Sequence, residues 1–104
     1  MDKDTWFKLT PGQQLGNIGS EIARARHWDT HKDYSNRQEA LKRALGLFDL
    51  TLDDRRWGAG LKEIARFREV VAAWFSGQSF FDIPLKSLED YCVNFVIQKK
   101  YNPE

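Results

Sequence analysis

An arginine and a histidine with the spacing of a catalytic pair lie in the segment 15–31, LGNIGSEIARARHWDTH. Arg26 and His31 fit the pattern R-x4-H, in which a guanidinium could bind a phosphate and an imidazole could transfer a proton. Each residue advances a helix by about 100°, so the two side chains would diverge by about 140° on one continuous helix. One chain cannot direct both at the same phosphate unless the helix ends before His31 or a second chain completes the site. The pattern needs two residue types only, so we attribute it to chance and predict no catalytic residue.

Two arginines interrupt apolar helix faces, Arg26 in the first predicted helix and Arg68 in the third. A buried guanidinium stays charged, so it needs a carboxylate partner or a route to water along its aliphatic stem. We predict an ion pair between Arg68 and Glu21 that fixes helix register, with Glu69 as a second candidate partner. In the alternative interpretation, Glu21, Arg26 and Arg68 form a ligand site that binds an anion or a nucleotide.

Other reactive side chains give weaker signals. His27 and His31 are spaced i, i+4, which can place two imidazoles on one ion, but no cysteine or acid has matching spacing. A structural metal site needs four ligands, so we predict solvated histidines, no metal site and no cofactor. Cys92 lies between Leu88 and Phe95 on an apolar stripe, where a cysteine is expected to be a small core residue.

The elements that must position these residues are four amphipathic helices. Apolar residues recur at helical spacing over about 10–29, 35–52 and 59–76, and in a fourth segment that begins at about 84 or 87 and ends at about 100. Thr10 and Ser35 are each followed three residues later by a glutamine, the pattern of a capping box at a helix start. Short connections between four such helices predict an all-α fold, an antiparallel up-down four-helix bundle, in a single domain over residues 1–104.

Two glycines, Gly16 and Gly19, lie beside the apolar face of the first predicted helix. Glycine inside a helix is less stable than alanine by about 0.5–1 kcal/mol, so a close approach of another helix is the expected compensation. Room for a ligand or a partner helix is the alternative.

Aromatic side chains outside the predicted helices must either cover the core or lie exposed, and exposed apolar patches usually mark interfaces. Phe80 and Phe81 lie in the irregular stretch 76–87, and Trp57 follows the charged turn DDRR. We name Trp57, Phe80 and Phe81 as candidate interface residues, with covering of the core as the alternative. Trp6 and Phe7 face the same choice.

Composition narrows the classes of function. The chain is 41% hydrophobic and 30% charged with a net charge of +1, which is ordinary for a globular protein and lacks the basic excess of a nucleic-acid binder. Its single cysteine excludes an internal disulfide, so we expect a cytoplasmic location. The N-terminal stretch has no signal-peptide pattern, and no apolar run approaches the roughly 18 residues of a transmembrane helix, so no membrane partner is expected.

The segments LGNIGSEIARA, ALKRALGLFDLTLDD and EIARFREVV together resemble a group of small uncharacterised bacterial all-helical proteins that share a GNIGSE…DLTL pattern. The resemblance covers about residues 9–97 and implies no particular chemistry. More distantly, the helical layout is similar to that of the bundles that accompany minimal nucleotidyltransferases, of the substrate-binding and HEPN types. The HEPN group carries an R-x4-6-H motif, usually late in the chain. This similarity of shape is an analogy, because one fold hosts many functions.

Our leading expectation is a non-enzymatic helical bundle that acts by protein–protein interaction, with a protein partner or a second copy of the chain in a homodimer. The alternative is a bundle that handles nucleotides or RNA, either beside a nucleotidyltransferase or as a HEPN-like ribonuclease. A third possibility is a small-molecule sensor that uses the region of Arg26 and Arg68.

Overall fold

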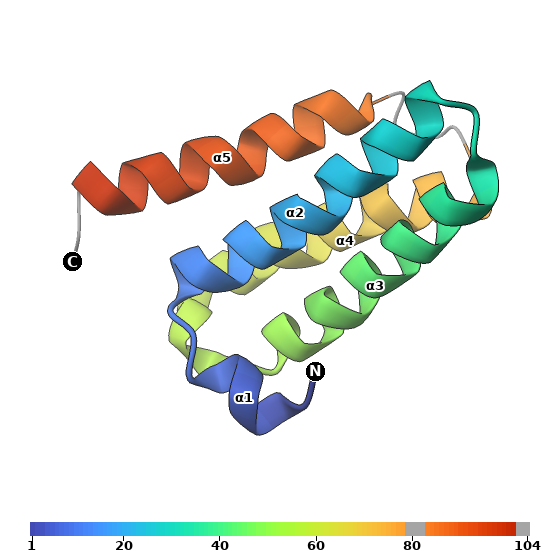
Figure 1. The fold of residues 1–104 in the computed structure, drawn as a ribbon. Helices are drawn as coiled ribbons and strands as arrows, with labels where there is room; N and C mark the ends of the chain where they lie inside the picture. Colours follow the sequence, from blue (N-terminus) through green and yellow to red (C-terminus); the bar gives the residue numbers. More distant parts are fainter. Residues whose placement is uncertain (79–82, 102–104) are drawn as a thin grey trace.

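The computed structural model describes residues 1–78 and 83–101, and the side chains up to residue 95. The described chain is all-helical, which confirms the predicted fold class. Successive long helices run in alternating directions (Figure 1). The described residues form five α-helices and one 3-10 segment: α1 (Lys3–Phe7), α2 (Pro11–Thr30), α3 (Tyr34–Leu52), η1 (Arg55–Gly60), α4 (Leu61–Ser76) and α5 (Leu85–Tyr101).

Local capping sets where α2 and α3 begin. The Thr10 hydroxyl accepts from the Gln13 backbone N–H and the Gln13 side chain accepts from the Thr10 N–H, so the predicted capping box is confirmed. The predicted start of the second helix at Ser35 was wrong. Asp33 is the N-cap of α3, because its carboxylate accepts from the backbone N–H and the side-chain amide of Asn36.

The short helix α1 was not predicted. Asp2 caps it by accepting from the Thr5 N–H at 2.8 Å. Trp6 is fully buried, and its indole N–H donates to the Thr51 hydroxyl of α3 at 3.0 Å. Trp6 therefore covers the end of the core instead of forming an exposed patch.

The connection from α3 to α4 is the 3-10 segment η1, which includes Trp57, and α4 begins at Leu61 instead of the predicted residue 59. Gly58 breaks the helical path there with φ 52°, a left-handed value that favours glycine. At its other end α4 stops at Gly77, which has φ 74° and ends the helix in the left-handed conformation typical of a C-terminal glycine.

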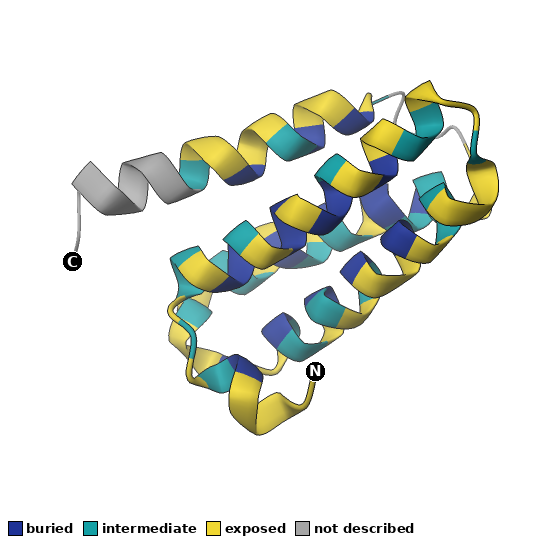
Figure 2. Ribbon diagram, in the orientation of Figure 1, coloured by how far each residue is buried: buried dark blue, intermediate teal, exposed yellow. Residues whose placement is uncertain are grey.

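The long helices do not contact one another equally. Helix α2 packs against α3 on one side and α5 on the other, and α3 also packs against α4. Figure 2 shows that the buried residues face inward between these helices. None of the described helices is apolar and long enough to cross a membrane. The core is built from apolar side chains of all five helices: Trp6, Leu15, Ile18, Ile22, Ala25, Ala40, Leu41, Ala44, Phe48, Ile64, Phe67, Val70, Val71, Leu85, Leu88 and Cys92.

Candidate functional site

An open apolar groove lies between α4 and α5. Helix α5 rests mainly on α2 and α4 mainly on α3, so the two helices leave a seam between them. The groove has a volume of about 250 Å³. Its walls are apolar side chains with a few polar groups: Phe67, Val70, Leu88 and Tyr91, together with Glu63, Arg66 and Ser87.

The width of the apolar face of α4 explains why this groove exists. The buried residues of α4 are spread over about half of the helix circumference, given a rotation of about 100° per residue. In order around the helix they are Ile64, Val71, Phe67, Val70 and Ala73. One neighbouring helix covers only part of such an arc. The Phe67 ring packs against Phe48 of α3 with centroids 5.0 Å apart, and Val70, farther along the arc, lines the groove.

Two contacts near the ends of the seam tie α4 to the segment before α5 and η1 to α5 itself. At one end the Trp74 indole N–H donates to the Ile83 carbonyl at 2.7 Å. At the other end the ring of Trp57 stacks on Phe95 with centroids 5.4 Å apart. Together with the packing of α5 on α2, these contacts make the groove a formed feature of the fold.

Tyr91 forms the exposed edge of the groove. Its ring meets Phe67 edge-on at 5.1 Å, yet 41% of the residue remains exposed. Partial burial raises the pKa of its hydroxyl, and the negative charge of Glu63 adds to the effect, so the phenol stays neutral at physiological pH. Tyr91 therefore presents a neutral, largely apolar ridge beside the groove.

The polar rim of the groove carries both signs of charge. The Arg66 guanidinium lies 3.7 Å from the Glu63 carboxylate, and both side chains are more than half exposed. An exposed ion pair of this kind contributes little to folding stability. Both groups are therefore available to a partner that contacts the rim.

A buried polar cluster at the far end of the α2–α3 pair is a second place where polar groups gather. The fully buried Gln14 amide donates to Asp54 at 2.8 Å and to the Trp6 carbonyl at 3.1 Å. Its oxygen accepts from the Trp57 indole N–H at 2.8 Å. The Gln14 side chain thus ties α1, α2 and η1 together, and both of its N–H donors are used within the fold.

Asp54 is the charged member of this cluster. The Arg56 guanidinium donates to both of its carboxylate oxygens, and the Arg56 backbone N–H donates to it as well. These hydrogen bonds, with help from Gln14, lower the pKa of Asp54 to about 2, and the same pairing raises the pKa of Arg56. Arg56 also donates to the Leu9 carbonyl at 2.6 Å, so the pair anchors the segment that precedes α2.

The predicted charge partners differ from those observed. Arg68 donates to Asp49 of α3 at 2.7 Å, so the predicted pair of Arg68 with Glu21 was wrong. Helix α4 packs on α3 instead of α2, and the acid that faces Arg68 therefore comes from α3. Glu21 accepts from Arg24 on its own helix and from Arg43 of α3 at 2.8 Å.

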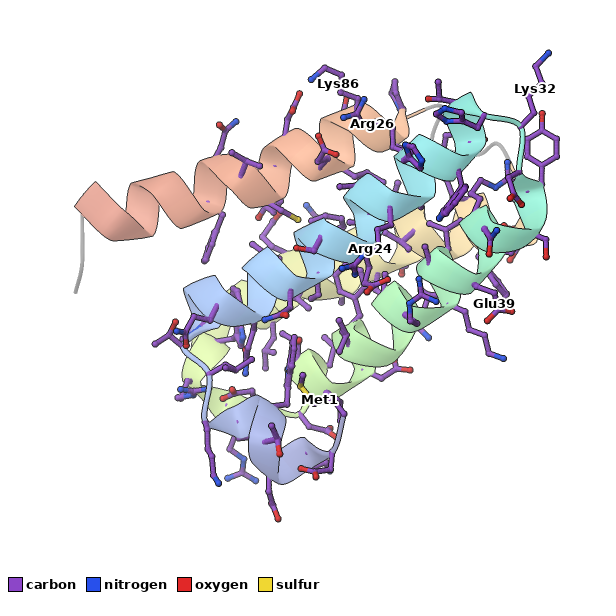
Figure 3. The ribbon with its side chains drawn as sticks, viewed as in Figure 1. Met1, Arg24, Arg26, Lys32, Glu39 and Lys86 are labelled. Carbon is purple, nitrogen blue, oxygen red and sulfur yellow. The ribbon has the colours of Figure 1, made fainter. Side chains whose placement is uncertain are left out.

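Arg26 lies at the contact between α2 and α5, where it makes two hydrogen bonds, of 3.2 and 3.1 Å, to the two oxygens of Glu89. Figure 3 shows Arg26 beside α5 and Arg24 on the side of α2 that faces α3. Arg26 and Arg68 therefore have separate carboxylate partners at separate helix contacts. Anion binding by Glu21, Arg26 and Arg68 stays a prediction.

The pattern R-x4-H does not form one site in the folded chain. Arg26 is bound to Glu89, whereas the His31 ring lies at the end of α2 with its Nδ1 2.8 Å from the His27 carbonyl oxygen. Cys92 is buried, and burial together with the charge of Glu89 raises the pKa of its thiol to about 12. A thiol with that pKa is a poor nucleophile at neutral pH.

The candidate interface residues have different outcomes. Trp57 is half-buried and bonded to Gln14, so it belongs to the packed end of the bundle. Phe80 and Phe81 lie outside the described residues. Sequence reasoning missed the groove and Tyr91, although the unusually wide apolar arc of 61–76 was a signal that one neighbouring helix would not cover it.

Comparisons of the chain with protein-family models, with curated proteins and with solved structures find no match.

Proposed function

We propose that this protein is a non-enzymatic interaction module, an antiparallel four-helix bundle that binds a second copy of itself through the face formed by α4 and α5. The observation that supports this is the open apolar groove with the exposed ridge of Tyr91 along its edge. Apolar surface that stays accessible in a folded chain commonly marks an interface.

The shape of this face favours a second copy as the partner. A two-fold interface uses the same patch on both protomers, so the patch must be complementary to itself. Here a ridge and a groove lie side by side, because Tyr91 projects at the edge of the hollow lined by Phe67, Val70 and Leu88. In a two-fold pair, each Tyr91 would enter the groove of the other protomer.

The charges on the rim have the same self-complementarity. Glu63 and Arg66 are neighbours on one turn of α4, and both are exposed. Two antiparallel copies of α4 would place Glu63 of each protomer opposite Arg66 of the other. A partner whose rim carried charges of a single sign would attract only one of these two side chains and repel the other.

Sedimentation of the purified chain from micromolar to submillimolar concentration tests the proposal. We expect a reversible monomer–dimer equilibrium that Tyr91→Lys weakens by about tenfold or more, because a buried charge in the partner's groove is unfavourable. Val93→Lys is the matched control, since Val93 is 49% exposed on the same helix and does not line the groove. A chain that stays monomeric throughout the range, or equal weakening by both variants, would overturn the proposal.

Charge reversal gives a second test that does not depend on Tyr91. Glu63→Arg or Arg66→Glu alone leaves like charges facing each other, so each single variant should dimerise less well. The double variant restores opposite charges on both protomers and should recover the dimer. Because both side chains are exposed, thermal melts should show that all three variants remain folded. Failure of the double variant to recover would contradict a two-fold contact at this rim.

A further inference from the structure

The last turn of α2 brings two imidazole rings together. His27 and His31 are four residues apart, both are exposed, and their ring centroids are 4.4 Å apart. The sequence alone predicts solvated histidines and no metal site here, but from this pairing we propose that His27 and His31 form a surface site for one late first-row divalent metal ion, Cu²⁺ or Ni²⁺. The site is independent of the groove between α4 and α5.

The hydrogen bond of His31 prepares its ring as a metal ligand. The Nδ1 atom lies 2.8 Å from the His27 carbonyl oxygen, and a carbonyl oxygen can only accept. Nδ1 must therefore carry the proton, which leaves the lone pair of the neutral ring on Nε2. In proteins, a metal-binding histidine usually donates a hydrogen bond from the ring nitrogen that does not bind the metal. This hydrogen bond fixes the tautomer and the orientation of the ring.

The ring separation indicates which metal geometry suits the pair. With a metal–nitrogen distance of about 2.1 Å and a nitrogen-to-centroid distance of about 1.2 Å, a metal ion bound by both rings would lie about 3.3 Å from each centroid. Centroids 4.4 Å apart would then correspond to an angle at the metal of about 84°. This is close to the angle between adjacent ligands in a square-planar or octahedral complex, whereas a tetrahedral zinc ion prefers about 109°.

Few unpaired positive charges that would repel a metal cation lie near the two histidines. Arg26 on the same helix and Arg37 near the start of α3 both have carboxylate partners, Glu89 and Asp29. Lys32 extends away from the turn into solvent (Figure 3). Among the described residues no group of three His, Cys, Asp or Glu side chains is placed to hold a metal, so water would complete the coordination of an ion on this pair.

Titration of the full chain with Cu²⁺ at neutral pH, followed by calorimetry and tryptophan fluorescence, tests the site. The Trp28 ring meets His27 edge-on at 4.9 Å, so a Cu²⁺ ion on the pair should quench Trp28. We expect one ion per chain. His27→Gln and His31→Gln should each weaken binding by about tenfold or more, because loss of even an outer-shell partner commonly costs that much. In the Trp28→Phe variant, most of the fluorescence quenching should disappear, whereas the affinity for Cu²⁺ measured by calorimetry should be unchanged.

Binding of Ni²⁺ can also be measured through the thermal stability of the folded chain. An ion bound across one helical turn stabilises the folded state by mass action, so excess Ni²⁺ should raise the melting temperature of the native chain and leave that of His31→Gln unchanged. If neither histidine variant changes the affinity, the ion binds elsewhere, for example at the N-terminal amine, and the proposal is overturned. Binding of Zn²⁺ more tightly than Cu²⁺ would contradict the geometric argument.

Discussion

Gly19 of α2 lies directly against Cys92 of α5, and a Cβ atom added to Gly19 would lie 2.8 Å from the Cβ of Cys92. Real Cβ atoms essentially never approach so closely, so glycine is what permits the two helices to meet here. The predicted close helix contact is thus confirmed for Gly19, and for Gly16 it stays a prediction. The contact also explains why α5 follows α2 and leaves the seam beside α4 open.

Gly19→Ala should destabilise the fold by about 1–3 kcal/mol, because the cost of overpacking exceeds the gain in helix propensity. Gly46→Ala is the matched control on α3, where an added Cβ would meet nothing within 4 Å. This control should stabilise the fold by about 0.5–1 kcal/mol. Urea denaturation measures both. A higher midpoint for Gly19→Ala would show that α5 can move away from α2 at little cost.

Asp54 should make stability depend on pH in the acid range. Its pKa is lowered from 3.8 to about 2 in the folded state, so its ionised form stabilises the fold. That contribution, about 2 kcal/mol, is fully present above about pH 4 and is lost as the pH falls to about 2. Asp54→Asn should lower the free energy of unfolding by at least that amount at neutral pH and flatten its pH dependence between those limits.

Asp53→Asn is the control for this experiment, because Asp53 is the adjacent acid, is 58% exposed and pairs with the exposed Lys3 at 3.1 Å. We expect a change within about 0.5 kcal/mol for this variant. Denaturant melts from neutral pH to about pH 2 provide the comparison. Equal effects of the two substitutions would show that the buried cluster around Gln14 does not depend on the charge of Asp54.

Double-mutant cycles should distinguish the observed partner of Arg68 from the predicted one. Arg68→Met with Asp49→Asn should show a coupling of about 0.5–1 kcal/mol, a modest value because Asp49 is 59% exposed. Arg68→Met with Glu21→Gln should show a coupling near zero. Glu21→Gln alone should still destabilise the fold, since its buried carboxylate accepts from Arg24 and Arg43. A larger coupling of Arg68 with Glu21 than with Asp49 would contradict the observed pairing.

The sequence by itself determined the features that depend on near neighbours in the chain. The capping box of Thr10 and Gln13 and the periodic apolar faces of the four long helices could be predicted, because hydrogen bonds three residues apart and a repeat of about 3.6 residues are local properties. The start of α3 was missed by two residues, because Asp33 competes with Ser35 for the same capping role and the pattern did not rank them.

Only the tertiary structure decided which faces meet. The partner of Arg68, the burial of Gln14 and Asp54, and the open groove beside Tyr91 all depend on α4 packing on α3 while α5 packs on α2. A helical pattern shows which face of each helix is apolar, but it does not say which other helix covers that face or how closely. That choice depends on the summed packing of many distant side chains, among them the contact of Gly19 with Cys92, which no stretch of the sequence contains by itself.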